Sequence, residues 1–170
     1  MRNLAFDFTE QTVIVTGGAR GIGLELGRFF VRSGADVYLM DCDKDEVGKA
    51  AANTGARPIH ADVSNTVDVD TAVEQIINET GRVDVIVNNA GILRDKVLWK
   101  LTDDDWEQVL AIHAGGSFRL TRACVSHFRK QGYGRVVNVT SYTGLRLGRP
   151  RRQGSVVRAV AGARSAAAGV

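Results

Sequence analysis

One turn, rich in glycine, constrains the fold of this chain more than any other segment. It covers Thr16 to Gly23, reads Thr-Gly-Gly-Ala-Arg-Gly-Ile-Gly, and joins the apolar, β-branched run Thr12–Thr16 to a helical pattern. Gly17 permits a tight turn, Gly21 lets the backbone approach a pyrophosphate, and Gly23 allows close packing of helix on strand. The free N–H groups at the start of such a helix carry partial positive charge and bind phosphates. The segment therefore predicts a turn that holds a dinucleotide.

The rest of the sequence alternates short apolar runs with amphipathic stretches. In the helix after the turn, Ile22, Leu26, Phe29 and Phe30 recur at helical spacing and are expected to face the sheet. The alternation predicts an α/β fold, a doubly wound parallel sheet of Rossmann type in the order 3-2-1-4-5, truncated after the fifth strand. The expected strands are Thr12–Thr16, Asp36–Met40, Pro58–Ala61, Val83–Val87 and Gly134–Thr140, and the expected helices are Gly21 to Ser33, Lys44 to Asn53, Thr66 to Thr80 and Asp103 to Lys130.

The composition divides the chain near Leu145. Residues 1–145 are expected to form the dinucleotide-binding domain, and residues 146–170, rich in Arg, Ala and Gly, a poorly ordered tail. The tail holds six of the 22 basic residues and none of the 19 acidic ones, so the domain itself is mildly acidic. A domain of that charge offers no basic face, and no nucleic-acid partner is expected.

Cysteine, histidine and hydropathy patterns exclude several other classes of protein. The two cysteines, Cys42 and Cys124, are far apart in the sequence, so a disulfide scaffold is not expected and a reducing compartment fits. His60 and His127 have no partners at ligand spacing, so no metal site is expected. No apolar run reaches the length of a membrane span or a signal peptide, so we expect no membrane partner and a cytoplasmic location.

An acidic residue at the end of the second expected strand indicates which dinucleotide would bind. Asp41 lies 18 residues after Gly23, where a carboxylate can accept both hydroxyls of the adenosine ribose. The same carboxylate would repel the 2′-phosphate of NADP. The sequence therefore favours NAD over NADP, while a solvated strand end is the alternative interpretation of Asp41.

Four motifs together resemble the short-chain dehydrogenase/reductase family. The turn matches the family's Thr-Gly-x-x-x-Gly-x-Gly, and the pair Asp62-Val63 follows the third expected strand as it does in that family. Asn88-Asn89-Ala90-Gly91 follows the fourth strand, and Asn138-Val139-Thr140-Ser141 resembles the fifth strand with its catalytic serine. The resemblance covers residues 9 to about 145 and implies hydride transfer between a nicotinamide cofactor and the hydroxyl or keto group of a small-molecule substrate.

The resemblance also implies roles for single residues. Asp62 and Val63 would flank the adenine, and Ser141 would be the catalytic serine that holds the substrate oxygen. Arg20 either reaches a phosphate or stays solvated. The cofactor contacts expected from the turn and from the loop after the fourth strand are Gly17, Arg20, Gly21, Ile22, Gly23, Asn89, Ala90 and Gly91.

Two features resemble β-ketoacyl-ACP reductases and β-hydroxyacyl-CoA dehydrogenases within the family. The loop Gly91 to Lys96 is similar to theirs, and His113 stands where the family usually has an asparagine of a proton relay. The dehydrogenase domains of peroxisomal multifunctional β-oxidation enzymes are similar in having a histidine there. The resemblance implies a 3-hydroxyacyl or 3-oxoacyl thioester as substrate, and His113 either serves the relay or fills a gap beside its helix.

One part of the family pattern is missing. The family's catalytic tyrosine and lysine would fall at Gly154 and Arg158, but no tyrosine follows Tyr142 and no lysine follows Lys130. Three interpretations stay open: an NAD-dependent oxidoreductase by descent, a non-catalytic dinucleotide-binding module, and a truncated or frame-shifted product. The missing pair predicts little or no dehydrogenase activity for this chain. Family members are usually homo-oligomers, built partly on the helix that this tail replaces.

Overall fold

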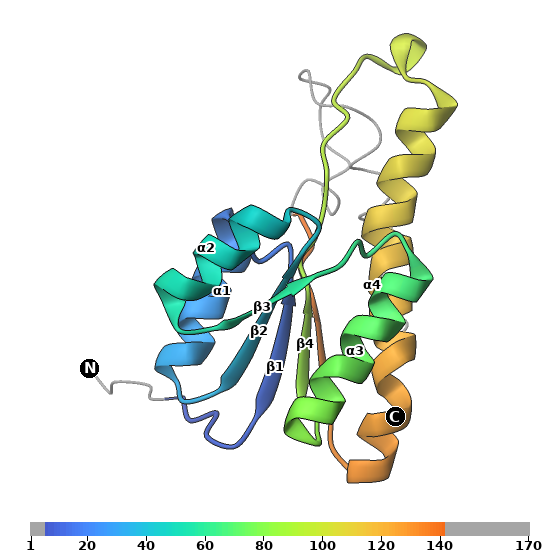
Figure 1. The fold of residues 1–170 in the computed structure, drawn as a ribbon. Coiled ribbons are helices and arrows are strands. Elements are labelled where there is room, and N and C mark those ends of the chain that lie inside the picture. Colours follow the sequence, from blue (N-terminus) through green and yellow to red (C-terminus); the bar gives the residue numbers. More distant parts are fainter. Residues whose placement is uncertain (1–5, 142–170) are drawn as a thin grey trace, which may run out of the picture.

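A parallel sheet lies at the centre of the computed structural model, which describes residues 6–141 (Figure 1). Its five strands lie in the order β3-β2-β1-β4-β5, and every neighbouring pair is parallel. The predicted fold class and strand order are confirmed. The strands are β1 (Thr12–Thr16), β2 (Asp36–Asp41), β3 (Arg57–His60), β4 (Val85–Asn88) and β5 (Arg135–Asn138).

Helices cover both faces of the sheet, as a doubly wound fold requires. α1 and α2 lie on one face, and α3 and α4 lie on the other (Figure 1). A short 3-10 helix, Leu98–Lys100, was not expected from the sequence, whereas the other elements begin and end within two residues of their expected limits. The helices are α1 (Gly21–Arg32), α2 (Lys44–Thr54), α3 (Thr66–Thr80) and α4 (Asp103–Gln131). None of the helices within residues 6–141 is both long and apolar enough to cross a membrane.

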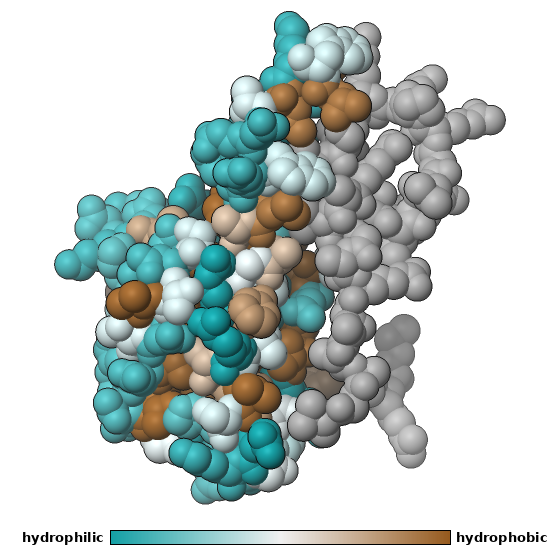
Figure 2. All heavy atoms as spheres, turned by 90° about the vertical axis from the view of Figure 1, so that its right-hand side faces the viewer, coloured by the Kyte–Doolittle hydropathy of each residue, from teal (hydrophilic) through white to brown (hydrophobic). Residues whose placement is uncertain are grey.

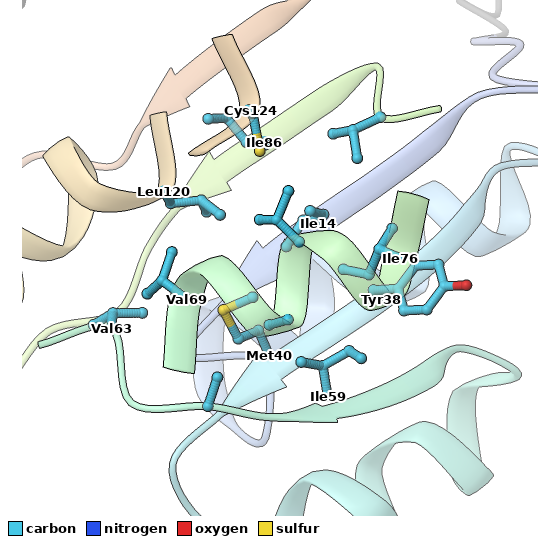
Figure 3. Close-up of a cluster of buried hydrophobic side chains, with 14 of the residues drawn as sticks. Ile14, Tyr38, Met40, Ile59, Val63, Val69, Ile76, Ile86, Leu120 and Cys124 are labelled. Carbon is cyan, nitrogen blue, oxygen red and sulfur yellow. The ribbon is translucent and has the colours of Figure 1, made fainter. Parts of the chain in front are cut away.

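Alternate residues of the central strands enter two separate cores. In β1, Ile14 points into the core beneath α3 and α4, whereas Val13 and Val15 point toward α1 and α2. All five residues of β1 are buried, because helices cover the sheet on both sides. Figure 3 shows the first of these cores, with side chains from the sheet, from both helices and from the loop after β3: Ile14, Tyr38, Met40, Ile59, Val63, Val69, Ile76, Ile86, Leu120 and Cys124.

Helix α1 makes its closest approach to the sheet at a glycine, although Phe30 also packs in the core beneath it. A Cβ added to Gly27 would come within 2.5 Å of a β2 side chain, so the helix packs at a distance that suits glycine. Phe30 is buried near it, but Ile22 and Phe29 remain 66% and 41% exposed. The inward face expected from the sequence is therefore wrong at Ile22 and Phe29, because the closest contact follows the small residues instead.

A buried carboxylate fixes the start of the two central strands. Asp84 has no exposed surface, and its Oδ2 accepts hydrogen bonds from the Thr12 N–H at 2.9 Å and from Arg82 Nε at 2.8 Å. Its Oδ1 accepts from Arg82 Nη2 at 2.7 Å. Both carboxylate oxygens thus have the partners that a buried charge needs. The arrangement aligns β1 with β4 at the amino ends of the strands.

Replacing Asp84 by asparagine should destabilise the fold. The amide keeps the volume but loses the charge that pairs with Arg82, so we expect the free energy of unfolding to fall by about 2–3 kcal/mol. Urea denaturation followed by circular dichroism measures this change. Asp95→Asn, at an exposed carboxylate, is the matched control. Equal unfolding midpoints for the two variants would contradict the role of Asp84.

The start of α4 and the loop before it form an arm that extends beyond the carboxyl edge of the sheet (Figure 1). Thr102 and Asp105 make a reciprocal capping box, in which each side chain accepts the other's backbone N–H at 3.1 Å. Lys96 Nζ lies 2.5 Å from Asp105 Oδ2. The Lys96 ammonium, together with the Thr102 donors, lowers the pKa of Asp105 to about 2. Figure 2 shows exposed apolar side chains among polar ones on this arm. The large apolar residues with exposed side chains here are Leu93, Val97, Leu98, Trp99 and Trp106.

Acid should weaken the capping box of α4. Because folding lowers the pKa of Asp105, its carboxylate stabilises the fold above the ordinary pKa of 3.8 and loses this effect as the pH falls toward about 2. The difference in urea midpoint between the wild type and Asp105→Asn should therefore be constant above about pH 5 and shrink below about pH 4. Glu107→Gln, at an exposed carboxylate of the same helix, is the control. A difference for Asp105→Asn that is independent of pH would contradict this assignment.

Candidate functional site

The glycine turn adopts backbone angles that glycine takes without strain. Gly17 and Gly21 have φ angles of 64° and 57°, in the left-handed region. A Cβ on Gly23 would overlap the carbonyl oxygen of Gly17 and lie 2.6 Å from Asn89 Nδ2. Gly23 therefore packs against the turn itself and against the loop after β4, which extends the packing role expected from the sequence.

Hydrogen bonds join this turn to the loop after β4. Asn89 Nδ2 donates to the carbonyl oxygens of Thr16 at 2.9 Å and of Gly17 at 3.3 Å. Thr16 Oγ1 accepts from the N–H groups of Asn89 and Ala90, both at 3.0 Å. Asn89 thus shapes the turn from the neighbouring strand, a contact that sequence reasoning did not identify.

Asp41, the last residue of β2, holds the other side of the turn. Its Oδ2 accepts from the Ala19 N–H and its Oδ1 from the Asp43 N–H, both at 3.1 Å. Arg20 lies at the rim, with its guanidinium 3.6 Å from the Asp43 carboxylate and its side chain 75% exposed. The Asp41 carboxylate is therefore ordered by two backbone groups and faces the space beside the turn.

A cleft of about 480 Å³ opens at the carboxyl ends of the strands, within the size range of small-molecule sites. It brings together most of the predicted cofactor residues. Gly21 lies beside it on the outer surface of α1, and Gly23 lies beneath the turn. The predicted residues that line the cleft are Gly17, Arg20, Ile22, Asp41, Asp62, Val63, Asn89, Ala90 and Gly91; those that sequence reasoning missed are Met40, Cys42, Ala61, Ile92 and Ile112.

Position along the chain could have indicated several of the missed lining residues. Met40 and Ala61 lie at or just after the carboxyl ends of β2 and β3, where ligands bind in open α/β sheets. Cys42 directly follows Asp41, and its pKa is raised by burial and by the nearby carboxylates of Asp41 and Asp62. Its thiol therefore lines the cleft as a neutral group. Ile112 comes from the middle of α4, and no local pattern points to it.

Asp62 starts a tight turn beside the cleft. Its Oδ1 accepts from both the N–H and the hydroxyl of Ser64, each at 2.8 Å. Its own N–H donates to Asp68 Oδ2 at 3.2 Å. These bonds link the turn to the first part of α3 and present the Asp62-Val63 pair to the cleft.

His113 contacts the loop that carries Gly91. Its Nε2 lies 3.1 Å from the N–H nitrogen and 3.0 Å from the carbonyl oxygen of Ile92, so the tautomer sets which of the two it bonds. A Cβ on Gly91 would collide with the imidazole ring. His113 therefore holds the backbone of Gly91 and Ile92 against α4.

Ser141 lies three residues beyond Asn138 at the carboxyl edge of the sheet and is exposed. The predicted tail and the positions Gly154 and Arg158 lie outside the described residues. Within residues 6–141, no group of three or more His, Cys, Asp or Glu side chains is arranged to hold a metal ion.

Alanine at Gly23 should distort the turn. The added methyl group has no room between the Gly17 carbonyl and Asn89, so we expect a loss of about 1–3 kcal/mol in the free energy of unfolding. Gly48 is the matched control, because it lies in α2 with nothing within 4 Å of an added Cβ. Gly48→Ala should keep or raise stability, since alanine favours the helix. Thermal or urea denaturation compares them, and equal behaviour of the two variants would contradict the packing role of Gly23.

Comparison with known proteins agrees with this geometry. A family model described as "short chain dehydrogenase" matches residues 11–152. The chain is 41% identical over 140 residues to the "Peroxisomal hydratase-dehydrogenase-epimerase" of Neurospora crassa. The matched region covers 82% of this chain and 16% of that protein. It is 36% identical over 143 residues to the "3-oxoacyl-[acyl-carrier-protein] reductase FabG" of Chlamydia muridarum, covering 80% of this chain and 57% of that one. It is 33% identical over 157 residues to the "Hydroxyacyl-CoA dehydrogenase ChsB1" of Mycobacterium tuberculosis, covering 82% and 49%. The chain thus spans about half the length of the last two relatives and less of the first.

Proposed function

Because this chain belongs to the short-chain dehydrogenase family, we propose that its cleft binds NAD and that the fold serves hydride transfer to or from a hydroxyl or keto carbon. One observation carries the proposal: the glycine turn, Asp41 and the loop Asn89–Gly91 converge on a single cleft. They come from three separate segments and meet where ligands bind in open α/β sheets.

The start of α1 fits a pyrophosphate. Its N-cap residue, Arg20, makes no side-chain capping bond, and the first turn of α1 holds no acidic residue. The starts of α2, α3 and α4, in contrast, are each capped by a side chain: Asp43, Asn65 and Thr102. Open space surrounds the position where Gly21 would carry a Cβ. The uncapped N–H groups of α1 and its positive end therefore suit a phosphate ligand.

Asp41 supports NAD as the dinucleotide. Each of its oxygens accepts one backbone N–H and keeps a lone pair that can accept a ribose hydroxyl. The 2′-phosphate of NADP at the same place would lie next to the Asp41 carboxylate, which two backbone N–H groups hold in position. The two negative charges would repel each other and disfavour NADP.

The wild-type chain should bind NAD more tightly than NADP, and Asp41→Ala should narrow this preference. The alanine also removes two backbone hydrogen bonds, so Asp41→Asn, which keeps the volume and loses the charge, is the matched variant. We expect each variant to reduce the ratio of NAD to NADP affinity by about tenfold, as titration calorimetry measures it. Tighter NADP binding by the wild type would overturn the assignment to NAD, and no binding of either dinucleotide would overturn the proposed site.

The substrate class that we propose is a 3-hydroxyacyl or 3-oxoacyl thioester. The names of two relatives, a 3-oxoacyl reductase and a hydroxyacyl-CoA dehydrogenase, support it. The bound nicotinamide would supply or accept the hydride. From this chain, we assign Ser141 to hold the substrate oxygen. We assign His113 to hold the loop of Gly91 and Ile92, and a role in a proton relay is the alternative.

We propose that this chain, as it stands, binds the cofactor but has little or no turnover. Reduction of a ketone adds a hydride to carbon and a proton to oxygen. No tyrosine follows Tyr142 and no lysine follows Lys130, so the family's proton donor is absent from the sequence. A positioned acid contributes roughly 10²–10⁴-fold in rate.

Restoring the acid should restore turnover. NADH oxidation with an acetoacetyl thioester should be at least about 10²-fold slower for this chain than for a version whose tail is rebuilt to carry Tyr-x-x-x-Lys, with the tyrosine at the position of Gly154. Equal, substantial turnover by both would mean that another group donates the proton. NAD binding without turnover in either version would favour the second candidate, a non-catalytic dinucleotide-binding module.

Location and assembly stay predictions. We propose a cytoplasmic protein that acts on a small molecule, although four relatives have names that describe peroxisomal enzymes. A homo-oligomer is what family membership favours, and analytical ultracentrifugation measures the oligomeric state.

A further inference from the structure

Two neighbouring glycines interrupt the middle of α4. Gly115 and Gly116 lie well inside a helix of 29 residues that carries no other glycine. Apart from proline, glycine is the least favourable residue in a helix interior, because it has the most backbone freedom to lose. A pair at this place therefore calls for a packing explanation.

Each of the two glycines makes room for a different side chain. A Cβ on Gly116 would come within 2.8 Å of Val63 Cγ2, so this glycine lets the loop after β3 lie against α4. A Cβ on Gly115 would come within 2.5 Å of Arg119 Nη1. Gly115 thus opens the helix surface along which the Arg119 side chain runs back toward the start of α4.

The Arg119 guanidinium binds backbone carbonyls rather than a carboxylate. Nη1 donates to the Ala111 carbonyl at 3.0 Å and, over a longer 3.4 Å, to the Val63 carbonyl. Within residues 6–141, none of the ion pairs involves Arg119. A half-buried guanidinium that bridges two backbone segments joins them through charge-assisted hydrogen bonds.

The loop that Arg119 reaches forms a wall of the cleft. Asp62 and Val63 line the cleft from this loop, and Ile112 lines it from α4. The other bonds of Asp62 go to Ser64 and Asp68, which tie the loop to itself and to α3. In the described part of the chain, Arg119 is the side chain that hydrogen-bonds this loop to α4.

We propose that Arg119 is a positioning residue of the cofactor site, with Gly115 as the residue that lets it act. By holding the Val63 carbonyl against α4, it sets how far the Asp62-Val63 wall stands from Asp41 across the cleft. The inference rests on the proposed dinucleotide site. It deepens that proposal by naming the residue that positions the Asp62-Val63 wall, which would face the adenosine half of the dinucleotide.

Three variants and one control test the proposal through ligand affinity. Arg119→Met keeps the stem and removes the donors, Arg119→Lys keeps a charged donor, and Gly115→Ala blocks the path while leaving Arg119 in the chain. Gly48→Ala is the control, a helix-interior glycine with open space around it. Titration calorimetry uses NAD and ADP-ribose, which lacks the nicotinamide.

Arg119→Met and Gly115→Ala should lower the affinity for NAD and for ADP-ribose by the same factor of about ten. This factor corresponds to the loss of one charge-assisted hydrogen bond. Arg119→Lys should recover part of that loss, and Gly48→Ala should bind like the wild type. If the wild type binds both ligands and all four variants bind them equally well, the positioning role is overturned while the proposed function stands.

Hydrogen exchange of the ligand-free chain separates this inference from the proposed function. Amide exchange in residues 62–65 should be faster in Arg119→Met and Gly115→Ala than in Gly48→Ala, because the loop has lost its link to α4. If the wild type binds neither ligand, the proposed function fails, and the exchange rates still test the link. Equal exchange rates in Arg119→Met, Gly115→Ala and the control Gly48→Ala would overturn the inferred link between the loop and α4.

Discussion

The hydrogen bonds between the glycine turn and the loop after β4 fix the two segments on which the cleft depends. Thr16 Oγ1 accepts the N–H groups of Asn89 and Ala90, and Asn89 Nδ2 reaches back to the Thr16 carbonyl. These bonds join the carboxyl ends of β1 and β4 beside the cleft, at the point where the strand order changes direction. They also place the surface against which Gly23 packs. The uncapped start of α1 is presented to the cleft because this junction orients the turn that precedes it.

Helix α4 supports the cleft as well as covering the sheet. Its inner stripe, which includes Leu120 and Cys124, is buried in the core shared with α3. Nearer the start of α4, His113 holds the backbone of Ile92, and Arg119, next to Leu120, reaches the Val63 carbonyl. Two loops that leave different strands therefore depend on the same helix. The interior glycines of α4 lower its intrinsic stability. In return, Gly116 lets the loop after β3 approach the helix closely, and Gly115 makes room for the Arg119 side chain.

Much of the fold and part of the candidate site could be predicted from local patterns. The alternation of strands and helices predicts the strand order, because right-handed crossovers leave few other arrangements. The left-handed φ angles of Gly17 and Gly21 were predictable, because other residues are strained there. The inward face of α1 was not, since hydropathy counts large side chains, whereas the helix meets β2 through Gly27. The role of Thr16 as an acceptor for the loop after β4 also escaped prediction.

The sequence by itself determined which backbone conformations each segment can adopt and which chemical groups stand at the strand ends, such as the Asp41 carboxylate after β2. Those properties depend on residues close together in the chain. Only the tertiary structure decided which of these groups meet: Asp84 binds the Thr12 N–H across 72 positions, and Arg119 reaches Val63 across 56. The physical reason is that such contacts depend on the distance at which whole elements pack. That distance is set by the volumes of side chains, or their absence at glycine, on elements far apart in the sequence.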